Sequence, residues 1–283
     1  MKVLVTGVTG QLGYDVCRIL NERGVEHRGV DSAQLDVTNE RAVSVYLGAY
    51  RPDAVIHCAA YTAVDKAEEE QERCFAVNED GTRNLAQACK AIGAKLLYLS
   101  TDYVFPGDGD CFYETDDPTG PKNVYGASKL AGEQAVRETL AEHFILRTSW
   151  VYGSNGGNFV KTMLGLSQTR DTVRVVNDQV GSPTYTTDLA PLLCDMIKTD
   201  HYGTYHATNE GICSWAEFAQ EIFRLSEKPT TVQPIPTCEY PTPAARPLNS
   251  RLGKASLDAG GFFHLPVWSN ALKRFLDTEN LQR

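Results

Sequence analysis

Short apolar runs alternate along the first half of the chain with segments whose apolar residues recur every three or four positions. The runs predict buried strands, because a strand covered on both faces is apolar throughout. The expected strands cover 3–6, 25–30, 54–60, 95–100 and 144–148, with a short one over 34–37. The periodic segments predict amphipathic helices, which cover 11–22, the stretch after Asn39, 78–91 and 125–139.

This alternation predicts an α/β fold with a Rossmann-type doubly wound parallel sheet. The rhythm then stops, and the segment 229–247 holds six of the 13 prolines. Helical periodicity returns only at 215–225 and 267–276. We expect a dinucleotide-binding domain over 1–150 and a smaller, partly helical C-terminal substrate-binding lobe over 151–283, with some later segments returning to the first domain.

Composition and charge limit the classes of partner. The 283 residues are 42% hydrophobic and 22% charged, which is ordinary for a soluble globular protein. The net charge of −9 disfavours nucleic acid and anionic membranes, since both reward clustered Lys and Arg. No apolar run approaches membrane-spanning length and no cleavable signal is evident, so we expect a cytoplasmic protein. The eight cysteines lack Cys-x-x-Cys spacing, which disfavours zinc ribbons and thioredoxin-like sites.

Glycines at positions 7, 10 and 13 lie in the turn between the first expected strand and the first expected helix. Such glycines let the backbone approach a pyrophosphate and let the helix pack close to the sheet, while the helix N-terminus offers free N–H groups. The alternative is a glycine-rich turn without a ligand, which the strand–turn–helix context disfavours. We therefore expect a dinucleotide to bind at Gly7, Gly10, Gln11, Leu12 and Gly13.

Residues at the ends of the following strands extend this expected site. Asp31 follows the second strand, where an acid accepts from the ribose hydroxyls of NAD and repels a 2′-phosphate. It favours NADH, but an ordinary turn aspartate fits the position as well, so both NADH and NADPH stay open. We expect the cofactor to reach further along the sheet edge, past Asp36, Val37, Ala59, Ala60 and Tyr61.

Tyr125 and Lys129 are four residues apart on an expected helix and therefore share one face. An ammonium beside a phenol favours the phenolate, so the pair can deliver a proton to a carbonyl oxygen near neutral pH. Thr101 ends the preceding strand, at the sheet edge where ligands of doubly wound folds bind, and its hydroxyl can reach the same oxygen. A Tyr-x-x-x-Lys pattern is common by chance, but its convergence with Thr101 and the glycine turn predicts a catalytic site.

These motifs resemble those of the extended short-chain dehydrogenase/reductase superfamily, and longer ones resemble the dTDP-4-dehydrorhamnose reductase family in particular. The longer motifs lie at 60–68, 100–105, 147–152, 158–163, 178–184 and 246–250. The resemblance runs from Met1 to about Leu276. It implies NADH- or NADPH-dependent reduction of the C4 keto group of dTDP-4-dehydro-L-rhamnose, the last step of dTDP-L-rhamnose synthesis.

The same resemblance implies roles for single residues. Tyr125 would donate the proton, Lys129 would activate it, and Thr101 would contact the carbonyl oxygen. Asp102 and Trp150 would contact the sugar nucleotide, which suits Trp150 because a flat apolar face fits a sugar ring or a base. A buried core tryptophan is an equally good interpretation of Trp150 from the residues alone.

Arg246 is a candidate for the substrate pyrophosphate, since a guanidinium can bind it bidentately, although a structural salt bridge is its alternative. The resemblance also implies, for some members, a Mg²⁺ ion held between two subunits by acidic side chains. Asp15 lies near one matching position, but Thr187 lies where another acid is expected. The sequence therefore predicts no metal ligands and leaves both a monomer and a homodimer open.

Other proteins of this fold compete with the reductase interpretation. Sugar-nucleotide dehydratases carry an added acid after Thr-Asp at the strand end, and Tyr103 stands in that position here. Epimerases are disfavoured less firmly. A non-catalytic binding or regulatory subunit would not need Thr101, Tyr125 and Lys129 together, and consumption of NADH only when the ketosugar is present would separate an enzyme from such a subunit.

Overall fold

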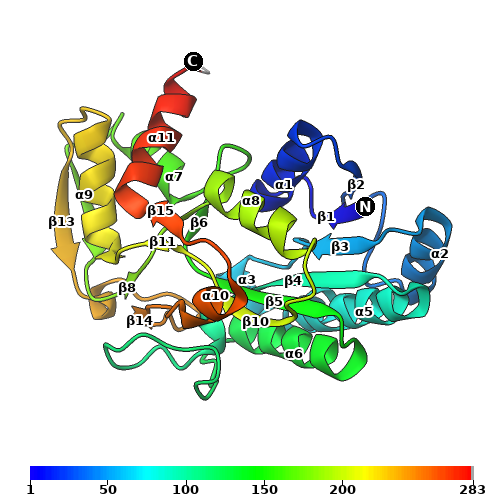
Figure 1. Cartoon of the computed structure of the whole chain (residues 1–283). Coiled ribbons are helices and arrows are strands. Elements are labelled where there is room, and N and C mark those ends of the chain that lie inside the picture. Colours follow the sequence, from blue (N-terminus) through cyan, green and yellow to red (C-terminus); the bar gives the residue numbers. More distant parts are fainter. Residues whose placement is uncertain (282–283) are drawn as a thin grey trace.

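A six-stranded sheet forms the centre of the protein in a computed structural model that describes residues 1–281 (Figure 1). Its strands lie in the order β10-β5-β4-β3-β1-β2, and every neighbouring pair is parallel. The strand order reverses between β1 and β3, and such a reversal opens a crevice at the carboxyl ends of the strands. The six strands are β1 (Lys2–Thr6), β2 (Glu26–Val30), β3 (Ala54–His57), β4 (Lys95–Thr101), β5 (His143–Thr148) and β10 (Gly203–His206).

Helices cover both faces of this sheet, as Figure 1 shows. One face carries α1 (Gln11–Glu22) and α8 (Thr186–Met196), and the other carries α2 (Glu40–Tyr50), α5 (Gly81–Ile92) and α6 (Val124–Thr139). Successive strand residues point to opposite faces, so that Val3 and Val5 join the first layer while Leu4 joins the second. The expected doubly wound α/β fold is confirmed.

The strand expected over 34–37 is wrong, because this segment forms turns. The carboxylate of Asp31 accepts from the backbone N–H groups of Ala33 and Gln34, each at 3.0 Å. Asp36 accepts in the same way from Thr38, also at 3.0 Å. Aspartate side chains that bind the backbone two or three residues on favour a turn over a strand, and this chemistry outweighs the short apolar pattern.

The strand expected over 54–60 ends early, at His57. Beyond it the backbone finds side-chain partners instead of a neighbouring strand. The N–H of Ala59 donates to Thr6 Oγ1 at 3.2 Å, and the N–H of Tyr61 donates to Asn78 Oδ1 at 2.8 Å. The segment is thereby free to line a cavity at the edge of the sheet.

The helices agree more closely with the sequence pattern. α1 and α9 (Trp215–Leu225) have the expected bounds, and α6 begins one residue earlier than expected. The helix expected over 78–91 is divided, since the π-helix η1 (Ala76–Asp80) precedes α5. The wider turn of η1 carries Asn78, whose side chain bonds to both backbone groups of Tyr61.

The later part of the chain divides between the sheet and a second core. β10 extends the sheet beside β5, and α8 packs on α1. Tyr152, Phe218 and Phe275 belong to a separate apolar cluster. The elements of this later part are β6 (Val151–Tyr152), α7 (Phe159–Leu166), β7 (Thr172–Val176), β8 (Val180–Gly181), β9 (Thr184–Tyr185), β11 (Asn209–Glu210), β12 (Cys213–Ser214), α9, β13 (Thr231–Ile235), η3 (Thr237–Glu239), β14 (Asn249–Ser250), α10 (Ala255–Gly260), β15 (Leu265–Val267) and α11 (Trp268–Leu281).

The division into lobes at residue 150 stays a prediction. Three short helices complete the first half of the chain. They are α3 (Val64–Ala67), α4 (Gln71–Phe75) and the 3₁₀-helix η2 (Asp102–Val104). Across residues 1–281, none of the helices combines the length and the hydropathy that a membrane crossing requires.

We expect Ser214→Ala to lower the free energy of unfolding by about 1 kcal/mol, because it removes the N-cap of α9. Ser214 Oγ accepts from the N–H of Glu217 at 3.1 Å, and the Glu217 carboxylate accepts from the N–H of Ser214 at 2.7 Å. The matched control is Ser44→Ala, at an exposed position inside α2. Urea unfolding at equilibrium measures both variants, and equal midpoints would contradict the capping role.

Candidate active site

A cavity of about 770 Å³ lies at the carboxyl ends of the sheet strands. That volume is within the usual range for small-molecule sites. Its walls come from the turns after β1, β2 and β3, the ends of β4 and β5, the start of α6, and Trp215 of α9. With one exception, Arg246, every predicted site residue lines it, namely Gly7, Gly10, Gln11, Leu12, Gly13, Asp31, Asp36, Val37, Ala59, Ala60, Tyr61, Thr101, Asp102, Tyr125, Lys129 and Trp150.

The glycine turn lies directly against the end of β3 and the start of α1. Gly7 has a positive φ of 72°, and a Cβ there would lie 2.6 Å from the backbone nitrogen of Ala59. A Cβ at Gly13 would lie 2.4 Å from the carbonyl oxygen of Gly7. No side chain caps α1 at Gly10, and its first turn carries no acid. The open helix end on the cavity wall therefore fits the pyrophosphate of a dinucleotide.

Asp31 lines the cavity at the end of β2. The bonds from Ala33 and Gln34 both go to its Oδ1. Among the described residues, Oδ2 accepts no hydrogen bond, so one carboxylate oxygen remains for a ribose hydroxyl. Turn formation and ribose binding, the two interpretations of this aspartate, are thus compatible.

Tyr125 and Lys129 both face the cavity from the first turns of α6. The side chain of Asn123 caps this helix by accepting from the N–H of Gly126 at 2.8 Å. Lys129 is only 2% exposed, and its Nζ lies 4.1 Å from the centre of the Tyr98 ring. Burial lowers the pKa of Lys129 to about 7, against the opposing charge of Glu133.

The phenol of Tyr125 is also buried, and burial raises its pKa well above the ordinary value, while the nearby Thr101 hydroxyl acts in the opposite direction. We expected the neighbouring ammonium to lower this pKa, but in the protein alone burial outweighs it. Tyr125 is therefore protonated at neutral pH, which is the state a proton donor requires.

Thr101 and Asp102 form a buried pair at the end of β4. The Thr101 hydroxyl donates to Asp102 Oδ1 at 2.9 Å, and the hydroxyl of Ser250 on β14 donates to Oδ2. Burial raises the pKa of Asp102 to about 6, and these hydrogen bonds oppose the rise. We had assigned no role to Ser250, since its place in the 246–250 motif gave no hint of a partner so distant along the chain.

Trp150 and Trp215 form one wall of the cavity. Their rings stack with centroids 3.7 Å apart and planes inclined by 13°. Trp150 has a φ of 49°, in the left-handed region that a bulky residue seldom adopts. The stack holds the strained residue in place and presents aromatic surface to a ligand. Trp215 is not among the predicted site residues, although a tryptophan directly after a helix cap was a visible signal.

Arg246 lies outside the cavity lining, in contrast to its expected place. Its Nη2 donates to Asp65 Oδ2 at 2.7 Å, and its positive charge opposes the rise in the pKa of Tyr103 that burial causes. Tyr103 does line the cavity, and its ring packs edge-on against Tyr125 with centroids 5.6 Å apart. The salt bridge that was the alternative interpretation of Arg246 is thus present in the structure.

The residues considered for a metal form an internal network. The buried carboxylate of Asp15 accepts from the hydroxyls of Thr186 and Thr187 and from Arg18. Within residues 1–281, no group of three or more His, Cys, Asp or Glu side chains is placed to hold a metal ion.

Comparison with known proteins identifies the family. The model of the RmlD substrate binding domain family matches residues 1–281. The dTDP-4-dehydrorhamnose reductase of Streptomyces griseus is 46% identical over 276 residues, which cover 95% of this chain and 91% of that protein. The chain belongs to the dTDP-4-dehydrorhamnose reductase family. The family resemblance expected from the motifs is thus confirmed.

Solved structures of family members have the same fold over the whole chain. A dTDP-4-dehydrorhamnose reductase from Clostridium acetobutylicum superposes with a TM-score of 0.97 at 42% identity, and 100% of each chain is covered. The dTDP-4-dehydrorhamnose reductase of Bacillus anthracis, solved in complex with NADP, has a TM-score of 0.96 at 45% identity and covers 98% of this chain and 100% of its own.

We expect Asp102 to make stability depend on pH. Its pKa rises from 3.8 to about 6 on folding, so the folded state holds the proton more tightly and stability falls as pH rises through this window. Asp102→Asn removes this pH dependence. The free energy of unfolding of the variant, relative to that of the wild type, should therefore rise by about 2 kcal/mol between pH 4 and pH 6. Urea unfolding across this range measures the gain, and a difference that is constant with pH would refute the assignment.

Proposed function

We propose that this chain reduces the C4 keto group of dTDP-4-dehydro-L-rhamnose to give dTDP-L-rhamnose, with NADH or NADPH as the reductant. The observation that carries the proposal is that one cavity joins the glycine turn to Tyr125, Lys129 and Thr101. The names of the family members and the NADP in the Bacillus anthracis structure support it.

The cofactor would lie along the turns after β1, β2 and β3, with its pyrophosphate at the open end of α1. When bound, the reduced nicotinamide supplies the hydride that C4 receives. Lys129, which lines the same cavity, would bind the nicotinamide ribose.

The side chains of the cavity supply the proton. Tyr125 donates its phenolic proton to the carbonyl oxygen as C4 is reduced, and the ammonium of Lys129 stabilises the phenolate that remains. Thr101, held by Asp102 and in contact with Tyr125, orients the same oxygen. Asp102 and the stacked indoles of Trp150 and Trp215 form the wall against which the sugar nucleotide would bind.

The arrangement around Tyr103 disfavours the dehydratase alternative. A dehydratase needs an acid after Asp102, but Tyr103 stands in that position and its ring packs against Tyr125. Epimerases and non-catalytic subunits of this fold are the remaining alternatives. Net consumption of NADH or NADPH with the ketosugar would exclude both, because an epimerase returns its hydride and a binding protein transfers none.

The deciding experiment is a coupled synthesis from dTDP-glucose in which this protein is the last enzyme, scored for dTDP-L-rhamnose. Absence of that product, with the earlier enzymes active, would sink the proposal. By the family resemblance we also expect a monomer or homodimer that acts in the cytoplasm, where its eight free thiols would stay reduced.

Tyr125→Phe should keep its affinity for the cofactor and lose roughly a hundredfold to ten-thousandfold in turnover, the usual contribution of a positioned general acid. Quenching of tryptophan fluorescence by NADPH measures the affinity, and absorbance at the nicotinamide band measures turnover. Turnover within twofold of the wild type would rule out Tyr125 as the proton donor.

Asp31→Ala should narrow the difference in kcat/KM between NADH and NADPH, because its carboxylate binds ribose hydroxyls and repels a 2′-phosphate. Steady-state kinetics with the two cofactors measure the ratio. The control is Asp36→Ala, at another cavity residue that the cofactor is expected to pass, and this variant should weaken the binding of both cofactors alike. An unchanged ratio in Asp31→Ala would remove this residue from the ribose site.

A further inference from the structure

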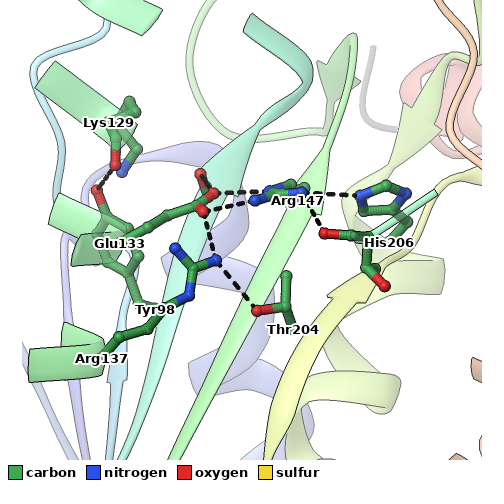
Figure 2. Close-up of polar contacts among 9 residues, drawn as sticks. Tyr98, Lys129, Glu133, Arg137, Arg147, Thr204 and His206 are labelled. Atoms are coloured by element: carbon green, nitrogen blue, oxygen red, sulfur yellow. Dashed lines mark hydrogen bonds and ion pairs between the residues drawn. The ribbon is translucent and has the colours of Figure 1, made fainter. Parts of the chain in front are cut away.

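A cluster of charged side chains lies buried beside Lys129 and outside the cavity lining (Figure 2). Glu133, one helical turn after Lys129 on α6, is 0% exposed. Its carboxylate accepts from Arg147 Nε at 2.8 Å and Nη2 at 2.7 Å, from Arg137 Nη2 at 2.8 Å, and from the hydroxyl of Ser100. Figure 2 shows this carboxylate pointing toward Arg147, behind which His206 lies.

The arginines keep this buried acid ionised. Burial alone would raise the pKa of Glu133, but the hydrogen bonds and charges of Arg147, the bond from Ser100 and the charge of Arg137 outweigh it and lower the pKa. Such a buried ion pair stabilises a fold little more than apolar side chains of similar volume would. Its presence one turn from Lys129 therefore suggests a role in the site rather than in stability alone.

Apart from Asp102, whose pKa is about 6, the other titratable groups around Lys129 carry no charge at neutral pH. On β3, burial lowers the pKa of His57 to about 3, so its imidazole is neutral. Burial raises the pKa of the thiol of Cys58, directly after β3, and that of Cys74 on α4. It also raises the pKa of the phenols of Tyr98 on β4 and Tyr125 on α6. Asp102, the other buried acid at this edge, acts on Tyr125. Glu133, four residues after Lys129 on the same face of α6, is thus the ionised acid whose charge raises the pKa of Lys129.

We propose that Glu133 is a positioning residue for the reduction, which holds the Lys129 side chain as an ammonium beside Tyr125. Because the residue acts on Lys129, this inference rests on the proposed function. Attraction between ions is strong in a buried environment, where water does not screen it. Arg147 and Arg137 keep Glu133 ionised. They also weaken the attraction between Glu133 and the Lys129 ammonium, because each places a positive charge beside the same carboxylate.

The test is the pH dependence of kcat/KM for ketosugar reduction in Glu133→Gln, in which the amide keeps an oxygen acceptor for Arg147. Lys129 then loses its proton more readily, and the alkaline limb of the profile should move to lower pH by about one unit, the usual size of a close charge effect. The matched control is Glu138→Gln on the same helix. Glu138 is 69% exposed and lies 3.5 Å from Arg83, so its profile should match the wild type.

A second variant separates this role from a structural one. Arg137→Gln breaks the same Glu133–Arg137 ion pair, but it removes a positive charge, so its alkaline limb should move to higher pH. Because Arg137 is 38% exposed, solvent screens its charge and the shift should be smaller. Loss of structure alone would lower activity in both variants without moving the two limbs in opposite directions.

An alkaline limb in Glu133→Gln that coincides with the wild type would overturn the inference while leaving the reductase activity established. If Glu133→Gln does not fold, a limb in Arg137→Gln that is unmoved or moves to lower pH would overturn it. If the wild type does not reduce the ketosugar, the proposed function fails. ¹⁵N NMR of the lysine Nζ then tests the inference directly, with Lys129 assigned by Lys129→Met and the same directions of shift expected.

Discussion

The site depends on one constraint, that all strands of the buried sheet run parallel and end at the same edge. Parallel strands are joined by crossover connections on the faces of the sheet, so the loop that follows each strand begins at this same edge. The order of strands reverses between β1 and β3, and the glycine turn lies at this point. A side chain at Gly7 would collide with Ala59, and one at Gly13 would collide with the backbone of Gly7. The end of β4 and the start of α6 then bring Thr101 and Tyr125 to the same cavity.

Burial sets the protonation state of nearly every group at this edge. It keeps the proton on Tyr125, raises the pKa of Asp102 to about 6 and lowers that of Lys129 to about 7. Burial thus keeps Tyr125 in the protonated form that the proposed reduction requires, but it also favours loss of the proton from Lys129. The negative charge of Glu133 opposes the loss of that proton, and its ion pairs with Arg147 and Arg137 keep Glu133 ionised.

The C-terminal part of the chain completes the site through a few long-range contacts. Ser250 donates to Asp102, Arg246 donates to Asp65, and Trp215 stacks on Trp150. Two of the residues contacted, Asp102 and Trp150, lie within two residues of the ends of β4 and β5. The later elements therefore hold the catalytic edge in place as well as covering it, and the strained backbone of Trp150 persists because the stack and its surroundings determine it.

Local patterns in the chain were enough to predict the alternation of strands and helices and the glycine turn, because apolar periodicity and glycine spacing are properties of neighbouring residues. They also predicted that Tyr125, Lys129, Thr101 and Asp31 would lie together at the strand ends. They failed at 34–37, where aspartate side chains bind the local backbone and form turns. Only the tertiary structure decided that Arg246 pairs with Asp65, that Ser250 reaches Asp102, and that Glu133 lies in an ion-pair cluster near Lys129. These contacts join residues far apart in the chain, and a side chain's partner and burial, which set its charge, exist only once the fold has brought them together.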